Sequence, residues 1–195
     1  MMDDPQIVKS ETNSNVHVHD RVTLDTMNLY LVICNIQKFH NVRALLLAAA
    51  AFGCHKVLLV GQTKNKDRDG LIPPQFELAM KQGLIQLQHF SKWNECLTYI
   101  KNNSIYLIGV EIDEKSQVLD EHYFRRNEEL LGMHENIAIF MGNEGQGIHP
   151  VHLQECKSLV RIPQYGAGTA SFNVNVAANI VLYRFQLWKR KFSFR

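Results

Sequence analysis

Short apolar runs, separated by helix-forming segments, constrain this chain of 195 residues more than any other feature. The runs lack the alternation of polar and apolar residues that marks a half-exposed strand. Continuous runs of this length are typical of strands buried on both faces of a parallel sheet. We therefore predict strands at residues 29–34, 56–60, 105–110, 137–141 and 159–162, and a further short strand at 84–87.

The segments between these runs have the composition and the end signals of helices. Asn41 is predicted to cap a helix that is rich in alanine and leucine and ends at Gly53. Helices are also predicted from Pro73 to residue 82, at 93–102, within 121–131 and at 171–191.

Strands that alternate with helices predict an α/β fold, with a mainly parallel sheet and helices on both faces. The length is typical of one domain, which we place at residues 28–195. Residues 1–27 are polar and rich in turn-forming residues, and we expect them to form a mobile N-terminal arm.

The composition, 46% hydrophobic and 21% charged, is that of an ordinary soluble globular protein. No apolar run has the length that a membrane span needs, and the acidic start does not resemble a secretory or mitochondrial leader. The four cysteines are scattered, which favours free thiols in a reducing compartment over disulfides or a zinc site. We expect a cytoplasmic location, with a nuclear one as the alternative, and no metal.

The formal charge changes sign along the chain. Residues 1–27 hold five acidic and two basic side chains, a balance of −3, whereas residues 156–195 hold seven basic side chains and no acidic one, a balance of +7. A basic segment of this kind suits a polyanion such as RNA. A solvated helix face and tail explains the same charges equally well.

Two glycine-rich loops follow two of the predicted strands. Gly142, Gly145 and Gly147 surround Glu144 directly after the strand at 137–141, and a second loop, GAG, begins at Gly166. The glycines at 142, 145 and 147 do not match the pattern of a phosphate-binding P-loop, and the glycine pattern of a dinucleotide-binding domain is not formed after the first predicted strand. Glycine permits positive φ and close approach to the main chain, so the paired loops suit the enclosure of a small molecule.

The segments GNEGQG and IPQYGAGTASFNVNVAA closely resemble the second and third motifs of the SpoU/TrmH family of RNA 2'-O-ribose methyltransferases, members of the SPOUT class. An earlier match at residues 41–61 extends the resemblance over about residues 28–188. The resemblance implies S-adenosylmethionine as the cofactor and tRNA or rRNA as the substrate. It also implies a C-terminal deep trefoil knot and a homodimer packed through the knotted region.

The resemblance also implies roles for individual residues. Glu144 is expected either to orient groups at the site or to bond to loop amides. The expected catalytic residues are Asn41, Arg43, Glu144, Ser171 and Asn173. The expected cofactor-binding residues are Gly109, Val110, Met141, Gly142, Asn143, Gly147, Ile162, Pro163, Ser171 and Asn173.

One position departs from the family pattern in a way that bears on catalysis. The family carries an arginine six residues after the first-motif asparagine, but here that position is Leu47. Arg43 lies one helical turn before Leu47, and a long side chain there is a candidate substitute. In the third motif, Asn175 stands where the family has a second hydroxyl residue.

Three functions therefore remain open. The first is an RNA 2'-O-methyltransferase. The second is a protein of the same fold that binds RNA and cofactor without transferring a methyl group, because of Leu47. The third is a flavodoxin-like binder of small molecules, which leaves the paired motifs and the basic segment unexplained.

Overall fold

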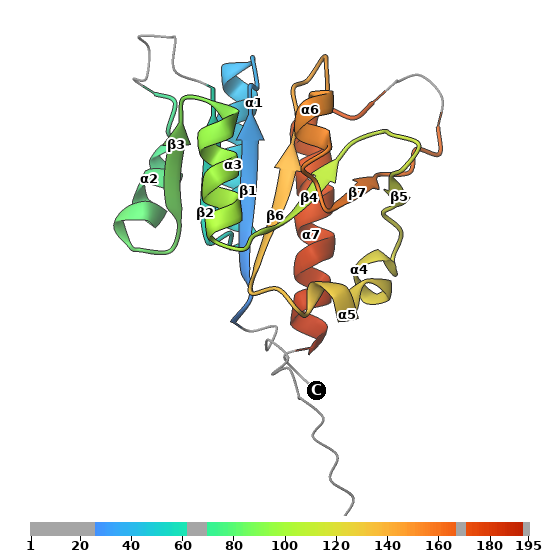
Figure 1. Ribbon diagram of the computed structural model, residues 1–195. Helices are drawn as coiled ribbons and strands as arrows, with labels where there is room; N and C mark the ends of the chain where they lie inside the picture. Colours follow the sequence, from blue (N-terminus) through green and yellow to red (C-terminus); the bar gives the residue numbers. More distant parts are fainter. Residues whose placement is uncertain (1–25, 62–69, 167–170, 193–195) are drawn as a thin grey trace, which may run out of the picture.

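Seven strands form one sheet in the order β3-β2-β1-β6-β4-β7-β5 in the computed structural model, which describes residues 26–61, 70–166 and 171–192 (Figure 1). Every pair of neighbouring strands is parallel. The strands are β1 (Asn28–Cys34), β2 (Lys56–Val60), β3 (Gln86–Phe90), β4 (Tyr106–Val110), β5 (Gln117–Val118), β6 (Asn136–Met141) and β7 (Ser158–Arg161).

Helices cover both faces of this sheet. Alternate residues of a strand point to opposite faces, so Leu31 and Ile33 of β1 enter one core and Tyr30 and Val32 the other. The first core is closed by α1 (Phe39–Ala51), α2 (Pro74–Lys81), α4 (Tyr123–Arg126), α5 (Glu128–Leu131) and α7 (Val174–Phe192). The second core is closed by α3 (Trp93–Asn102) and α6 (Pro150–Leu153). The predicted parallel α/β architecture is confirmed.

The carboxyl ends of the strands lie together at the top of Figure 1. From β1 the chain passes through α1 to β2 on one side, whereas from β6 it passes through α6 to β7 on the other side. The chain thus leaves the adjacent strands β1 and β6 in opposite directions. In open α/β sheets such a reversal opens a crevice that serves as a ligand site.

The predicted elements differ from the observed ones mainly at their ends. Asn41 does not cap α1, because the helix already begins at Phe39 and Asn41 lies within its first turn. The predicted strand at 84–87 is displaced to β3, and Ser171 precedes α7 instead of opening it. The sequence analysis missed β5 and α6, since elements of two and four residues carry no measurable periodicity.

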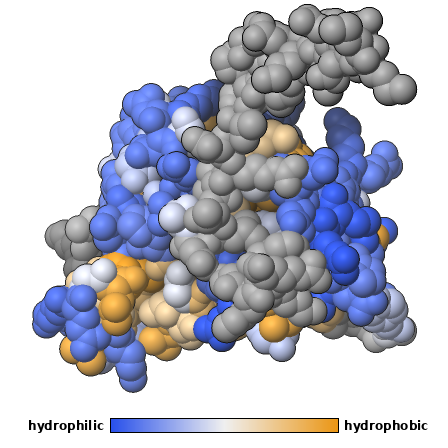
Figure 2. Space-filling view, turned by 90° about the horizontal axis from the view of Figure 1, so that it is seen from below, coloured by the Kyte–Doolittle hydropathy of each residue, from blue (hydrophilic) through white to orange (hydrophobic). Residues whose placement is uncertain are grey.

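At the other end of the molecule, where the strands begin, the polarity of the surface varies from side to side. Figure 2, seen from that end, shows hydrophilic residues on most sides and apolar ones gathered along one side. Loops that enter β3 and β6 there expose Leu84 and Met133. The predicted arm falls outside the described residues apart from residues 26 and 27, as do residues 62–69 and residues 167–170, which include part of the second predicted glycine loop.

Candidate functional site

A pocket of about 290 Å³ lies at the carboxyl ends of β4, β6 and β7, beside the start of α7; we call it the loop pocket. Seven of the ten residues expected to bind cofactor line it: Val110, Met141, Gly142, Asn143, Gly147, Ile162 and Ser171. Gly109, Pro163 and Asn173 do not line it. Glu144 and Phe172 complete parts of its wall. The two motifs therefore come together around one cavity.

The loop from Gly142 to Gly147 is a tight hairpin whose glycines are sterically required. Asn143 and Gly147 exchange two backbone hydrogen bonds of 2.9 Å each. A Cβ at Gly142 would overlap main-chain atoms of Gly147 and Ile148, and Gly147 has a φ of +65°. Glycine is the residue that meets both demands without strain. The glycines of the hairpin can present only main-chain atoms to the loop pocket.

Glu111 fixes this hairpin from outside, a role that the sequence analysis missed. Its carboxylate accepts a hydrogen bond of 2.6 Å from the Ile148 backbone N–H and one of 2.9 Å from the Ile112 N–H. The available signal was its position, an acidic residue directly after the buried strand that ends at Val110. The carboxyl ends of β4 and β6 are thereby tied together.

Glu144 satisfies the start of α1 across a sequence distance of more than 100 residues. Its Oε1 accepts hydrogen bonds from Asn41 Nδ2 at 2.8 Å and from the Lys38 N–H at 3.1 Å, and its Oε2 accepts one from the Gln37 N–H at 3.0 Å. The N-cap residue Lys38 makes no side-chain cap of its own. Glu144 therefore supplies the acceptor that a helix N-terminus needs, and its negative charge also suits the helix dipole.

The pKa of Glu144 reflects these contacts. Partial burial favours the protonated form, but the hydrogen bonds from Asn41, Gln37 and Lys38 together outweigh it and lower the pKa below its ordinary value. The sequence analysis left two roles open for Glu144. The carboxylate does bond to loop amides, including those of the loop between β1 and α1. It also lines the loop pocket as an anion at neutral pH.

Asn41 joins this carboxylate to the third motif. Its side chain is 1% exposed, and its Oδ1 accepts hydrogen bonds from Asn175 Nδ2 at 2.6 Å and from Asn173 Nδ2 at 3.4 Å. Asn173 Oδ1 in turn accepts the Asn175 N–H at 2.9 Å, beside the first turn of α7. We call Glu144, Asn41, Asn173 and Asn175 the site network. It links the starts of α1 and α7 through the hairpin after β6.

Asn175 is the member of the site network that the sequence analysis did not select. It was noted only as a replacement for a hydroxyl residue. The longer amide reaches Asn41, and its own Oδ1 is buried with no hydrogen-bond partner among the described residues. A replacement that departs from a family pattern and changes hydrogen-bonding capacity was the signal that could have found it.

Arg43 and Leu47 lie outside the loop pocket. The Arg43 guanidinium carbon is 5.9 Å from the centre of the Phe39 ring, one turn toward the start of α1, and the guanidinium also approaches Gly70. Helical side chains lean toward the N-terminus, so Arg43 is directed away from Leu47. Leu47 itself is 38% exposed. The Arg43 guanidinium thus lies beside Phe39, and its role as a substitute for the missing arginine stays a prediction.

Residues 26–61, 70–166 and 171–192 form neither a metal-binding cluster nor a membrane span. That part of the chain holds no cluster of three or more His, Cys, Asp or Glu residues able to bind a metal ion. Its helices are too short or too polar to cross a membrane.

Known proteins resemble this chain in sequence. The SpoU rRNA Methylase family matches residues 28–183. The 23S rRNA (guanosine-2'-O-)-methyltransferase RlmB of Acinetobacter baylyi is 28% identical over 158 residues, which are 80% of this chain and 58% of that protein. The chain thus spans about three fifths of the length of that relative.

Solved structures show the same fold. The A. aeolicus TrmH/SpoU tRNA modifying enzyme superposes with a TM-score of 0.66 at 20% identity, over 87% of this chain and 80% of that one. The SpoU methyltransferase AviRb from Streptomyces viridochromogenes, in complex with the cofactor AdoMet, gives a TM-score of 0.62 at 18% identity, over 85% and 58% of the two chains. With four fifths of its length matched by the family, the chain belongs to the SpoU rRNA methylase family.

Proposed function

We propose that the chain is an S-adenosylmethionine-dependent methyltransferase that modifies a ribose 2'-hydroxyl of tRNA or rRNA. The observation that carries the proposal is the loop pocket, because both glycine-bearing motifs of the family converge on it. Family membership supports the activity, and the matched relatives are named as enzymes of rRNA and tRNA. The basic C-terminal segment supports RNA as the partner.

The lining of the loop pocket fits the proposed cofactor. Met141, Ile162 and Val110 offer apolar surface to a nucleoside, and the hairpin offers main-chain polar groups at close range. The Glu144 carboxylate contributes a negative charge, which suits a sulfonium. When bound, S-adenosylmethionine supplies the electrophilic methyl group, and the protein supplies position and electrostatics.

The site network would hold the wall of this pocket in place. Glu144 anchors the hairpin to α1 through its hydrogen bond with Asn41. Asn41 in turn links α1 to the start of α7 through Asn173 and Asn175. Ser171 lines the pocket just before α7. We propose that Ser171, Asn173 and Glu144 orient the reacting groups, with Asn41 holding the carboxylate.

A specific observation favours a second candidate. Leu47 offers no group that moves a proton or holds a phosphate, and Arg43 is directed away from it. The alternative is therefore a binding protein that holds RNA and cofactor without transferring the methyl group.

Transfer of a labelled methyl group to total tRNA and rRNA tests the proposal. The wild-type protein is expected to incorporate label at least about 100-fold faster than the Glu144→Ala, Asn173→Ala double variant. Equal inactivity of both proteins on every RNA would overturn it. If an inactive wild type binds S-adenosylmethionine and Leu47→Arg gains activity, the binding-protein alternative stands instead.

We also propose a homodimer and a C-terminal trefoil knot, as the family resemblance implies. An exposed apolar stripe supports the dimer: Val176, Tyr183 and Leu187 recur on α7 at helical spacing, and Leu47 is exposed on the adjoining α1. Sedimentation should find dimers for the wild type and monomers for Tyr183→Asp. A monomeric wild type would contradict the dimer, and a crystallographic trace through residues 167–170 tests the knot.

A further inference from the structure

A second, larger cavity of about 830 Å³ lies on the other side of the hairpin from the loop pocket. It is bordered by Cys34 at the end of β1 and by Asn35 and Gln37 after it, and by Phe140 of β6 and the hairpin after that strand. This is the place where the chain leaves two adjacent strands in opposite directions. We call it the switch-point pocket. Its volume is within the range of sites for small organic groups.

The described polar side chains of the switch-point pocket are mainly amides and imidazoles. Its described lining residues include no Lys, Arg, Asp or Glu, but they do include the amides of Gln37 and Gln146 and the imidazoles of His149 and His152. The side-chain amides of Gln37 and Gln146 have no hydrogen-bond partner among the described residues. A phosphate or a carboxylate would need a cation here. The lining instead suits an uncharged ligand that both donates and accepts hydrogen bonds.

One wall of the same pocket is aromatic. Trp93 stacks on Phe140 with ring centres 4.9 Å apart and planes at 14°, and on His152 with ring centres 4.4 Å apart and planes at 24°. Phe140 and His152 line the pocket. Burial, with a smaller contribution from His149, lowers the pKa of His152, so its imidazole is neutral at pH 7. Phe140 is 0% exposed, so the aromatic rings that the pocket can present to a ligand are the imidazoles of His149 and His152. Aromatic rings, histidine included, beside hydrogen-bonding groups form the environment that receives unstacked bases in RNA recognition.

The switch-point pocket is physically coupled to the loop pocket. Gly142, Asn143, Gln146 and Gly147 line both cavities, so a single hairpin separates them. The Gln37 backbone N–H donates to Glu144, while the residue also borders the switch-point pocket. A ligand in one cavity therefore rests against the wall of the other.

We propose that the switch-point pocket binds an uncharged nucleobase of the RNA substrate, with Gln37, Gln146 and His152 contacting its edge or face. The choice of a nucleobase rests on the proposed function. The pocket is distinct from the loop pocket, so the base and the cofactor bind together and not in competition.

Ligand-observed NMR of the full chain with the four ribonucleosides tests this, with and without S-adenosylhomocysteine. At least one nucleoside should bind the wild type, and saturating S-adenosylhomocysteine should leave that binding intact. Gln37→Ala and His152→Phe should each weaken it about 5-fold to 10-fold, since each removes hydrogen-bonding groups. The matched control is Gln154→Ala, at an exposed position at the end of α6 that does not line the pocket, and it should bind as the wild type does.

The proposal is overturned if no nucleoside binds, if S-adenosylhomocysteine displaces the bound nucleoside, or if Gln37→Ala and His152→Phe bind as the wild type does. The outcome of the nucleoside-binding experiment is independent of the outcome of the methyl-transfer assay. An inactive protein with this pattern of nucleoside binding removes the proposed activity and keeps the base pocket. An active protein without nucleoside binding removes the base pocket alone.

Discussion

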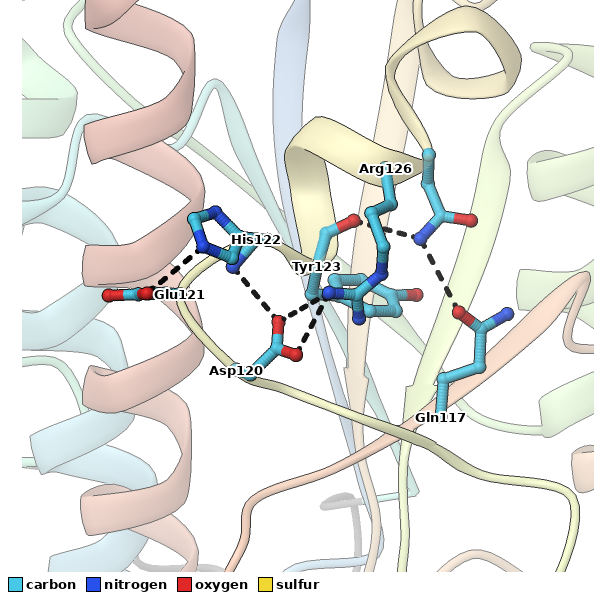
Figure 3. A network of polar contacts seen from close by, with 7 residues as sticks. Gln117, Asp120, Glu121, His122, Tyr123 and Arg126 are labelled. Atoms are coloured by element: carbon cyan, nitrogen blue, oxygen red, sulfur yellow. Dashed lines mark hydrogen bonds and ion pairs between the residues drawn. The ribbon is translucent and has the colours of Figure 1, made fainter.

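Two polar networks of similar bond length occupy opposite parts of this molecule. The site network buries Asn41 to 1% exposure and joins residues more than 100 positions apart. The edge network, around Asp120, Arg126 and Asn127, joins residues within ten positions of one another (Figure 3). The side chains of its ion pair, Asp120 and Arg126, are 42% and 49% exposed.

Hydrogen-bond length does not separate these networks, but burial and sequence separation do. Arg126 Nη1 lies 2.8 and 2.9 Å from the Asp120 oxygens, as close as Asn41 lies to Glu144. Water can replace any partner lost from the edge network, whereas a group of the buried Asn41 amide left unpaired would pay its full desolvation cost. The site network therefore supports the tertiary structure, and the edge network only shapes the local turn before α4.

The largest effect on the free energy of unfolding is expected from Asn41→Ala. The substitution removes the buried Asn41 amide, deprives Asn175 Nδ2 of its acceptor and deprives Glu144 Oε1 of one of its two donors. We therefore expect the free energy of unfolding to fall by about 2–4 kcal/mol. The matched control is Asn127→Ala in the edge network, which also removes a hydrogen-bonded side-chain amide, here one that donates to Gln117 and to the Tyr123 carbonyl. Its expected loss is about 1 kcal/mol or less. Equal losses in urea unfolding would contradict the contrast between the networks.

A smaller loss of unfolding free energy is expected from Asn175→Asp. The new carboxylate would face the Asn41 oxygen that now accepts the Asn175 amide, at a cost of about 1–3 kcal/mol. Asn179→Asp, one turn further along the exposed side of α7, is the control. Thermal unfolding at neutral pH compares the two, and the account is wrong about Asn175 if Asn179→Asp is the more damaging change.

Glu144→Gln should cost about 1 kcal/mol, the usual value of a helix cap, and its effect should depend on pH. Because folding lowers the Glu144 pKa below 4.5, its stabilisation is present above that value and is lost as the pH falls through the lower, folded-state value. The difference in unfolding free energy between wild type and Glu144→Gln should therefore shrink in acid. A difference that grows on acidification would mean that the carboxyl is protonated in the folded protein.

The smallest effect is expected from Asp120→Asn. The hydrogen bond from Arg126 is the largest influence on the Asp120 pKa and helps to lower it, but the pair is open to solvent and is screened by salt. We expect the urea midpoint to change little at low salt and not at all at high salt. If Asp120→Asn lowered the free energy of unfolding as much as Asn41→Ala does, and equally at low and high salt, the edge network would also stabilise the tertiary structure and the contrast would fail.

The fold was largely predictable because its strands are buried on both faces. The strand at 56–60 and the helix at 93–102 were predicted with their observed bounds, since apolar periodicity and length mark such elements directly. Strand order was not predictable, because β1 and β6 become neighbours through contacts more than 100 residues apart.

The site was predictable where the motifs have a pattern and not where its residues act through tertiary contacts. The hairpin glycines were found because their spacing reflects a backbone requirement. Glu111 and Asn175 were missed because each acts on a residue far away in the sequence. Asn41 was assigned as a cap because of its residue type, but Glu144 supplies that acceptor from another segment.

A crystal structure of the chain grown with S-adenosylmethionine tests the central claim most directly. The account predicts density for the cofactor in the loop pocket, between the Gly142–Gly147 hairpin, Ile162 and Ser171, with Glu144 still bonded to Asn41. Density for the cofactor elsewhere, or a loop pocket closed by the chain's own side chains at saturating cofactor, would contradict it.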